Sequence, residues 1–456
     1  MKARFAKVAY GIGNLGQALF FNSVQTFLIF FYTDAVHLDP KLVGLGFAIS
    51  YGVWNAINDP LIGVLSDRTR TRWGRRIPYI LVGTPLVLLL YFLVWSPPLG
   101  GHALAVPANW GIFLYFAIVI AVFDLVYTMV SVTYTALFPE AFLDLKERTE
   151  VSIYRQVAAM IGTALGVGLM PVIVEAFAKH AGTLGGWRWA GLVMGVVGAG
   201  AFGIALLGSR ERKQNSRQAE LSLLQAFKET FTNRSFLAYA AANLMICYIW
   251  SWLSAMVPFF TKYVLGAPES QMSLLFVAMF MAAILFYPLW RWVALRLGSK
   301  RTLALAVTLF VIFLSFVLVV GSLWQAFVMM LFVGAANSGI TLVRDIVLSD
   351  VIDEDELLTG MRREGSYFGV TAFVERLVMV LIGASSSLIL NLSGYDPNLA
   401  AQPATVARGI RLGMGLLPVA ALVLFLVAFR FYPLGREQVH ELRLKLDARH
   451  AEKPAA

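Results

Sequence analysis

Long apolar runs, joined by short polar connections, fill the chain from one end to the other. A helix needs about 20 apolar residues to cross a lipid bilayer. Divided on that length, the sequence predicts twelve membrane-spanning helices. Their centres lie near Phe20, Trp54, Leu88, Val122, Thr163, Val197, Trp250, Ala282, Phe310, Val333, Val378 and Leu422.

The composition supports the same fold class. Hydrophobic residues make up 59% of the 456 residues and charged residues only 14%, and the mean hydropathy is +0.72. A soluble domain carries about 25% charged residues. We therefore predict an all-α integral membrane protein embedded in the lipid bilayer.

The basic residues divide unevenly between the two sides of the predicted membrane. Cytoplasmic loops carry the excess of Lys and Arg, which sets orientation. Of the 37 basic residues, three fall inside spans and 28 lie on one side, against six on the other (Lys41, Lys179, Arg188, Lys262, Arg408 and Arg411). This distribution predicts a multi-pass protein of the cell (inner) membrane with both termini in the cytoplasm.

The net charge of +10 needs no nucleic-acid partner, because the basic residues lie in predicted cytoplasmic loops. The one cysteine, Cys247, excludes an internal disulfide. All five histidines lie in predicted loops or in the tail. We expect no cofactor, no intramembrane histidine that binds a metal and no histidine proton relay.

Two halves of six spans each are predicted. Residues 1–208 form the first half and 235–432 the second, joined by a polar linker (209–234) with an amphipathic helix and followed by a cytoplasmic tail (433–456). A basic hairpin that ends at Arg76 is repeated 225 residues later at Arg301. Parallel six-helix repeats of this kind are typical of the major facilitator fold, which binds solute near the bilayer midplane.

The second predicted span contains Asn55, Asn58 and Asp59. These positions share one face of a helix. A carboxylate at membrane depth costs at least about 2.5 kcal/mol by insertion scales, so it marks a functional site by default. Oxygen ligands on one face suit a hard cation.

The fourth predicted span carries a second polar stripe, made of Asp124, Tyr127, Thr128, Ser131 and Thr135. Asp124 and Thr128 lie one helical turn apart, and Ser131 follows on the same face. Hydroxyl stripes alone usually join helices. The added carboxylate favours a polar cavity over simple helix packing.

Three arginines, Arg155, Arg344 and Arg376, fall within predicted spans. Intramembrane arginines are rare and usually face a cavity or pair with an acid. Two alternatives stay open: Arg155 reaches the membrane surface with its long side chain, and Arg376 pairs with an acid on a neighbouring helix. Glu375 and Arg376 point about 100° apart on a helix, so they need not pair with each other.

Several motifs in chain order resemble the glycoside–pentoside–hexuronide:cation symporters, the family that includes the melibiose permease. They are YGIGNLGQ from Tyr10, FFYTDAVHL from Phe30, WNAINDPLIG from Trp54, SDRTRTRWGRRIP from Ser66, YTALFPE from Tyr134 and RREGSYFG from Arg362. The resemblance implies a cation-coupled carrier that works by alternating access. A related branch, the sodium-dependent lysophospholipid transporters, shares the second-span motif and is the main alternative.

The resemblance implies a cation site with two aspartates in the second span, an asparagine between them, and a threonine in the fourth. Here Asp59, Asn58 and Thr128 match, but the first aspartate is Asn55. We hypothesise that Asp124 supplies the missing carboxylate; the alternative is a site with one acid. A lone desolvated carboxylate favours its protonated form, so Na⁺ and H⁺ both stay open as the coupling ion.

The family's sugar site implies a lysine and an aspartate in the first span and an aspartate in the fourth. Gln17, Ala18 and Ser131 occupy those positions. The family's arginine of the fifth span survives as Arg155 and its lysine of the eleventh as Arg376. With Arg344 these residues predict an excess of positive charge, which suits a carboxylate, sulfonate or phosphate. We therefore expect an anionic solute, such as a hexuronide or a lysophospholipid.

The hairpin that follows the second span resembles the superfamily's cytoplasmic latch, which holds the two halves together. Its gating residues are Asp67, Arg68, Arg75 and Arg76; anchoring by positive charge alone is the simpler interpretation. An integral-membrane enzyme is disfavoured because the chain has no HExxH or GxSxG motif. A channel or sensor of the same fold stays open. The fold is expected to work as a monomer.

Overall fold

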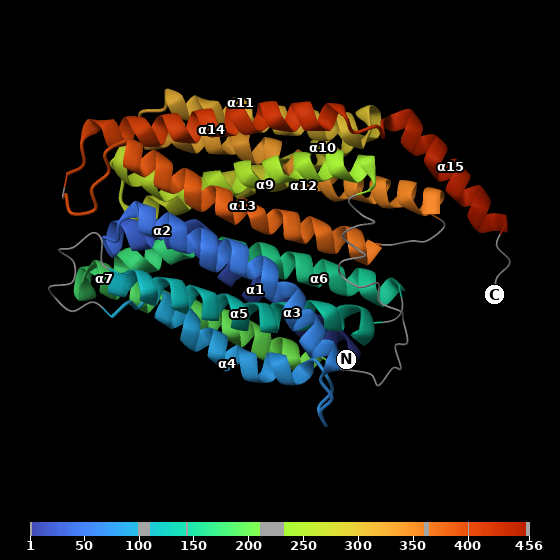
Figure 1. Cartoon of the computed structure of the whole chain (residues 1–456), viewed down its shortest axis with the longest axis horizontal. Helices are drawn as coiled ribbons and strands as arrows, with labels where there is room; N and C mark the ends of the chain where they lie inside the picture. The colour runs from blue at the N-terminus through green and yellow to red at the C-terminus, as the bar shows by residue number, and fades with distance from the viewer. Residues whose placement is uncertain are drawn as a thin grey trace. The chain divides into compact units, whose positions relative to one another are not determined.

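The computed structural model describes residues 2–98, 110–142, 145–209, 232–359, 364–399 and 401–452, which are almost entirely helical (Figure 1). One isolated β-bridge, Thr71 to Gly74, is the exception within those ranges. The helices of residues 1–209 are α1 (Lys2–Phe30), η1 (Phe31–Ala35), α2 (Pro40–Phe47), η2 (Ala48–Val53), α3 (Trp54–Arg68), α4 (Ile77–Val94), α5 (Trp110–Ala141), α6 (Leu145–Thr163), η4 (Ala164–Leu169) and α7 (Met170–Gly208). Those of residues 232–452 are α9 (Arg234–Phe259), η5 (Phe260–Val264), η6 (Glu269–Gln271), α10 (Met272–Leu297), α11 (Ser299–Ser315), η7 (Phe316–Leu318), α12 (Leu323–Thr359), α13 (Glu364–Leu392), α14 (Ala404–Arg430) and α15 (Arg436–Glu452).

The twelve predicted spans are confirmed. Ten helical segments of the described chain are long and apolar enough to cross a membrane. One of them, Glu150–Gly208, contains two spans, because Gly182 has φ +72° and breaks the helix. The remaining span is the run α2–η2–α3, which is more polar because it carries Asn55, Asn58 and Asp59.

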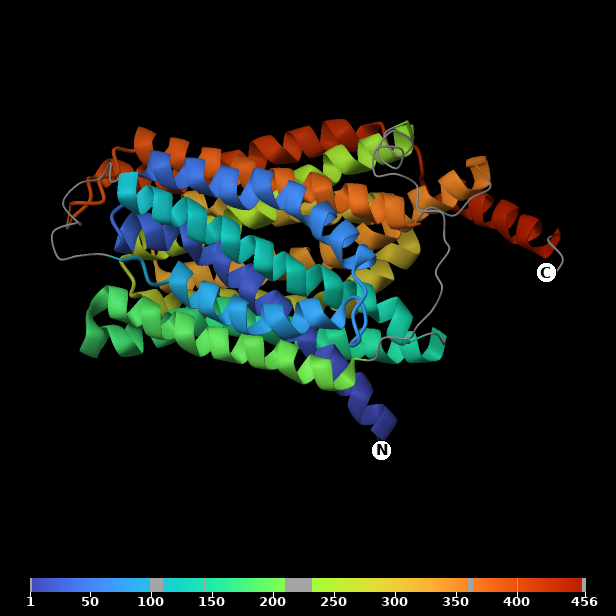
Figure 2. The ribbon, with the colours of Figure 1, turned by 60° about the horizontal axis from the view of Figure 1, so that its bottom comes forward.

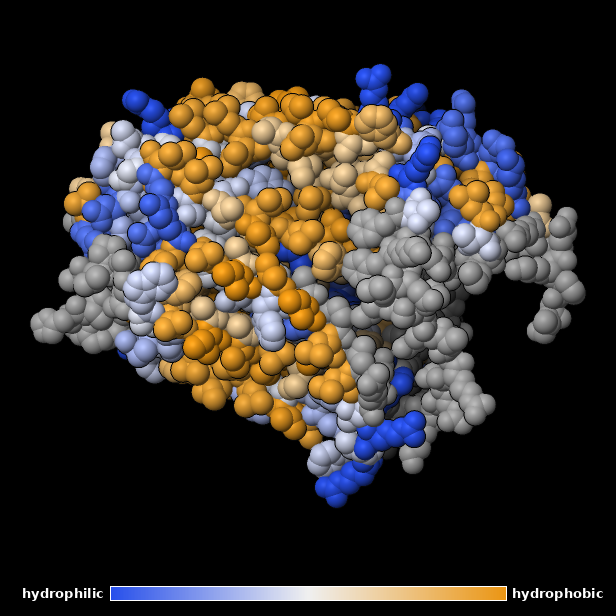
Figure 3. Space-filling view, viewed as in Figure 1, coloured by the Kyte–Doolittle hydropathy of each residue, from blue (hydrophilic) through white to orange (hydrophobic). Residues whose placement is uncertain are grey.

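Side chains follow the expected division between lipid and water. Large apolar residues such as Leu207, Leu285 and Leu295 are exposed on the helices, as expected where lipid replaces water as the solvent. Figure 3 shows apolar side chains along the length of the helices and hydrophilic ones gathered near helix ends. The chain is thus a multi-pass membrane protein.

The described chain divides into two compact units. The first contains residues 1–216, 254–276 and 379–410; the second contains 217–253, 277–378 and 411–456. The boundaries fall inside α9, α10, α13 and α14, so these units are not the predicted sequence halves. The division into repeated halves stays a prediction, and the predicted linker helix lies outside the described residues.

In the first unit, α1 packs on α6 and α7, while α4 and α5 lie side by side (Figures 1 and 2). Glycines permit the close approach: a Cβ at Gly16 would overlap the carbonyl oxygen of Gly198, and one at Gly162 would overlap that of Leu15. Small residues at helix interfaces are the common solution in membranes. This packing holds α1 tightly against α6 and α7.

The first unit also contains a repeated helix ending. The π-helical turns η1 and η5 lie 229 residues apart, and each is followed by a residue in the left-handed region: His37 with φ +61° and Gly266 with φ +62°. Matching backbone hydrogen bonds close both turns, at 3.0 Å from Val36 N to Phe31 O and 3.1 Å from Leu265 N to Phe260 O. A left-handed conformation is unusual for a residue other than glycine, so the two endings share an uncommon geometry.

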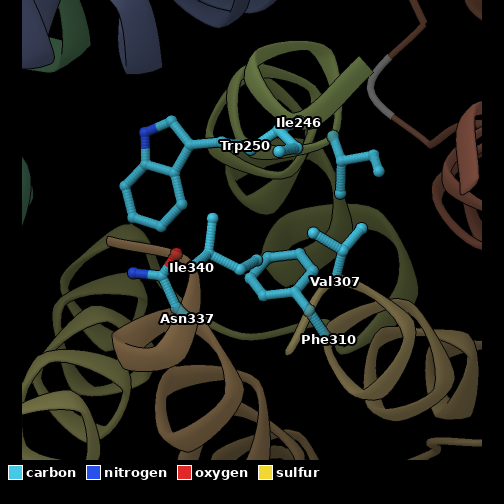
Figure 4. A pocket seen from close by; sticks show the side chains of 7 residues that line it. Ile246, Trp250, Val307, Phe310, Asn337 and Ile340 are labelled. Carbon is cyan, nitrogen blue, oxygen red and sulfur yellow. The ribbon is translucent and has the colours of Figure 1, made fainter. Parts of the chain in front are cut away.

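The second unit packs α11 on α12, and α15 follows α14 as a further helix where the sequence predicted only a tail. Arg436 of α15 donates from Nη1 to the carbonyl oxygen of Arg296 at 2.8 Å, which ties α15 to the end of α10. A small pocket lies among α9, α11 and α12 (Figure 4). Trp250 and Asn337 lie on one side of it, and Val307 and Phe310 on the other. Its lining is mainly apolar and contains no charged side chain, so we assign it no role in binding or catalysis.

Candidate functional site

The five residues predicted to bind a cation lie together in the first unit, where α3 packs on α5. Asn58 of α3 donates from Nδ2 to Asp124 Oδ2 at 2.5 Å, and Asn55 donates to the other oxygen, Oδ1. Thr128 of α5 donates from Oγ1 to Asp59 Oδ1 at 2.9 Å. Spacing of one helical turn on both helices produces this arrangement.

The cluster is buried and rich in oxygen. Asn55, Asn58, Asp124 and Thr128 are each at most 2% exposed. The amide nitrogens of both asparagines point at Asp124, and their Oδ1 atoms have no hydrogen-bond partner. A buried polar atom without a partner costs about 1–3 kcal/mol. Two carboxylates, two amide oxygens and a hydroxyl form the kind of ligand set that a hard cation binds.

Asp124 lies beside both asparagines of α3, and its role as the missing carboxylate of a cation site stays a prediction. Its carboxylate is in direct contact with Asn55, the residue that stands in place of the family's first aspartate. The two amide N–H groups stabilise its negative charge. The cluster thus contains two acids, Asp59 and Asp124, on facing helices.

The predicted solute residues of the first unit form a polar row beside α1. Gln17 donates from Nε2 to Ser131 Oγ at 2.8 Å, and the Tyr127 hydroxyl donates to the Gln17 carbonyl oxygen at 3.0 Å. Tyr127 and Ser131 are buried. Thr135, one turn further along α5, is exposed and lies outside these contacts. The structure brings Gln17, Tyr127 and Ser131 together.

Arg155 of α6 is held inside the unit. Its Nε donates to Asn14 Oδ1 at 2.9 Å, and its guanidinium lies 4.7 Å from the centre of the Phe138 ring. Asn14 precedes Gln17 by three residues and so shares its face of α1. A partner on the neighbouring helix favours the interpretation of Arg155 as part of the polar row over that of a side chain reaching for the membrane surface.

The predicted arginines of the second unit have different surroundings. Arg344 of α12 places Nη1 3.6 Å from Glu375 Oε1 of α13 and the same distance from Cys247 Sγ of α9. Arg376 is half-buried. Glu375 thus balances the charge of Arg344, and the excess of positive charge expected from the three arginines together stays a prediction. The sequence did not predict this ion pair, because the two residues lie on different helices and meet only in the folded structure.

The predicted latch is described only in part. Asp67 and Arg68 end α3, and their side chains lie outside the described residues. Arg76 is buried and donates to the carbonyl oxygen of Ala136 on α5, while Arg75 is half-buried. Arg76 thus ties the hairpin to the end of α5. Its gating role stays a prediction.

A cluster around Asp34 was missed by the sequence analysis. This buried carboxylate of η1 accepts from Lys262 Nζ at 2.5 Å, from the Tyr263 hydroxyl and from the Tyr395 hydroxyl at 3.3 Å. Phe30 and Phe259, also 229 residues apart, pack edge to face at 5.1 Å between ring centres. The acid inside the motif FFYTDAVHL was the available signal.

Asn14 and Asn243 were also missed. Asn243 of α9 donates from Nδ2 to Glu375 Oε1 at 3.1 Å. Each asparagine follows a buried tyrosine by four residues, Tyr10 before Asn14 and Tyr239 before Asn243. This repeated pair, spaced by 229 residues, could have been found by aligning the two halves of the sequence.

Comparison with protein families shows which family the chain belongs to. The family model described as MFS/sugar transport protein matches residues 9–436. The chain belongs to this family. The resemblance to the melibiose-permease type of symporter is thereby confirmed, and the protein is a transporter rather than an enzyme.

The names of relatives within the family give different solutes. The chain is 24% identical to the sodium-dependent lysophosphatidylcholine symporter 1 of Gallus gallus, covering 96% of this chain and 88% of that one. It is also 24% identical to the isoprimeverose transporter of Lactiplantibacillus pentosus, covering 98% and 92%. Cation-coupled symporters are therefore among its homologues, and the named solutes include both a lipid and a sugar.

Solved structures confirm the major facilitator fold. The nucleoside transporter NupG superposes with a TM-score of 0.68 at 13% sequence identity, covering 94% of this chain and 99% of that one. Within the described residues, no group of three His, Cys, Asp or Glu side chains is placed to hold a metal ion.

Proposed function

We propose that this protein is a Na⁺-coupled symporter of a small acidic or amphipathic solute, working by alternating access. The observation that carries the proposal is the buried oxygen cluster of α3 and α5. Two acids and two unpartnered amide oxygens favour a bound cation over a single proton carrier. The solute and the cation are coupled when both favour the same occluded state.

Coupling to one charge gives enough energy for accumulation. One elementary charge moving down 100 mV supplies about 2.3 kcal/mol, which corresponds to roughly 50-fold accumulation. Asp59 is our candidate for the residue that links cation to solute, because Thr128 connects it to α5. H⁺ coupling is the alternative that the experiment separates from Na⁺ coupling.

The acidic solute is proposed from Arg155, which lies among the polar side chains of the first unit. Its planar guanidinium suits a carboxylate, sulfonate or phosphate, and the row of Gln17 and Ser131 offers uncharged hydrogen-bonding groups nearby. A hexuronide and a lysophospholipid share this anionic chemistry. The two are distinguished by presenting the same acidic group with and without an acyl chain.

The test is counterflow and uphill uptake in proteoliposomes loaded with hexuronides, neutral glycosides or lysophospholipids, with and without Na⁺. We expect exchange of an acidic solute, stimulated by Na⁺ and retained in Asp59→Asn, with uphill uptake lost in that variant. Glu437→Gln is the control, because Glu437 is an exposed acid of α15 and lies far from α3 in sequence. Proton-driven uptake without Na⁺ would overturn the ion assignment, and exchange of neutral glycosides alone would overturn the solute class.

A further inference from the structure

A half-exposed ion pair joins α12 and α13 inside the second unit. Arg344 Nη1 lies 3.6 Å from Glu375 Oε1, and each side chain is 34% exposed. Charged residues within spans are costly and are usually retained for function. Because both groups keep access to solvent, either one can stay charged when the other is engaged elsewhere.

Arg344 is neutralised in this pair but loosely held. Charge-assisted hydrogen bonds of arginine are usually about 2.7–2.9 Å long and often paired. The contacts of Arg344 are longer: 3.6 Å to Glu375, 3.4 Å to Asp345 Oδ1 and 3.6 Å to Cys247 Sγ. A guanidinium has five N–H donors. An anion with two free oxygens could therefore bind Arg344 better than Glu375 does.

Glu375, by contrast, is positioned by a second partner. Asn243 donates to Glu375 Oε1 at 3.1 Å, at the point of α9 that corresponds to Asn14 in α1. In the first unit, Asn14 accepts from Arg155. An amide carries both a donor and an acceptor, so the repeated asparagine holds a cation in one unit and an acid in the other.

We infer that Glu375 is an internal substitute for the acidic group of the solute. It balances Arg344 while no solute is bound, and it yields Arg344 to the solute anion while it stays hydrogen-bonded to Asn243. This inference deepens the proposed function and rests on it. Selectivity follows from competition, because a neutral analogue has no charge with which to displace Glu375.

A purely structural ion pair predicts the opposite behaviour. If Glu375 only neutralises Arg344, its replacement by glutamine leaves an uncompensated arginine and weakens solute binding or the fold. If Glu375 competes with the solute, Glu375→Gln frees Arg344 and strengthens the binding of anions. The direction of one affinity change therefore separates the two roles.

Cys247 gives a direct readout of this site in the full-length protein. It is the one cysteine of the chain, it is half-buried, and its Sγ lies 3.6 Å from Arg344 Nη1. An anion bound to Arg344 should slow its reaction with the neutral reagent N-ethylmaleimide. The concentration that halves this rate measures anion binding without any transport.

We expect D-glucuronate and glycerol 3-phosphate to protect Cys247, and D-glucose not to. Glu375→Gln should lower the half-protecting anion concentration about threefold or more, the effect of removing one charge at roughly 7 Å in a water-like medium. Glu437→Gln removes an exposed acid of α15 that is not among the contacts of Arg344, so we expect no change. Arg344→Gln should abolish protection.

An unchanged or raised half-protecting concentration in Glu375→Gln would overturn the inference, as would the absence of anion protection in all variants. Failure of the proposed function looks different. Anion protection that tightens in Glu375→Gln, without counterflow of any solute, would retain the competitor role and reject transport. Counterflow of an acidic solute without tightening would reject only the competitor role.

Discussion

At the scale of single residues, the buried cluster of α3 and α5 sets the sharpest constraint. Thr128→Ala removes one hydroxyl from the proposed cation site and with it a hydrogen bond to Asp59. A ligand that binds only the folded protein stabilises it by mass action. We expect Na⁺ to raise the melting temperature of the wild-type protein and to have a smaller effect on Thr128→Ala, as measured by thermal unfolding in detergent.

Thr128→Ser keeps the hydroxyl and serves as the control, because it should retain most of the Na⁺ effect. Asp124→Asn goes further, since it replaces the acceptor of two amide N–H groups by a partial donor. That variant should lose the Na⁺ effect and about 1–3 kcal/mol of stability. Equal Na⁺ stabilisation in Asp124→Asn and the wild type would rule out this cluster as the cation site.

Residue patterns predicted the site unevenly. Asn55, Asn58, Asp59, Asp124 and Thr128 were foreseeable because polar side chains at helical spacing stand out in apolar spans. The pairing of Arg344 with Glu375 was not, because residues on separate helices meet only through tertiary packing. The motif FFYTDAVHL drew attention to the segment that contains Asp34. It could not predict that Asp34 is buried against residues from distant segments, because those contacts form only in the folded chain.

At the scale of elements, α1 depends on close contact with α6 and α7. A side chain at Gly16 would meet the backbone of Gly198, and backbone cannot yield as a flexible side chain can. Overpacking costs about 1–3 kcal/mol or more. We expect Gly16→Val to lower the melting temperature and the yield of folded protein. Gly203→Ala, with no atom within 4 Å of the added Cβ, should behave as the wild type.

The repeated helix endings η1 and η5 make a second prediction at this scale. Lys262 is 40% exposed and Asp34 only 3%, so removing the lysine leaves a buried acid that still has two tyrosine donors. We expect Asp34→Asn and Lys262→Gln each to destabilise the protein by about 1–3 kcal/mol. The double variant should cost less than the sum, because the two residues act as a pair. Strict additivity in chemical unfolding would contradict the contact.

At the scale of the whole molecule, twelve spans and the major facilitator fold could be predicted because span length and hydropathy are local properties. The break at Gly182 separates the two spans of Glu150–Gly208 and preserves the predicted count. Orientation rests on a different physical principle, the retention of basic loops in the cytoplasm, and it has its own test. In that scheme Arg70 lies in the cytoplasm and Lys179 outside, and both are exposed.

The orientation is tested by placing single cysteines in a Cys247→Ser background. A membrane-impermeant maleimide should label Lys179→Cys in intact cells and Arg70→Cys only after permeabilisation, because the charged reagent cannot cross the bilayer. Counterflow activity of each variant would show that the carrier is still folded. Labelling of Arg70→Cys in intact cells would show that the orientation is the reverse of the predicted one. The 28 basic residues assigned to the cytoplasm would then lie outside the cell, which would contradict the rule that basic loops stay in the cytoplasm.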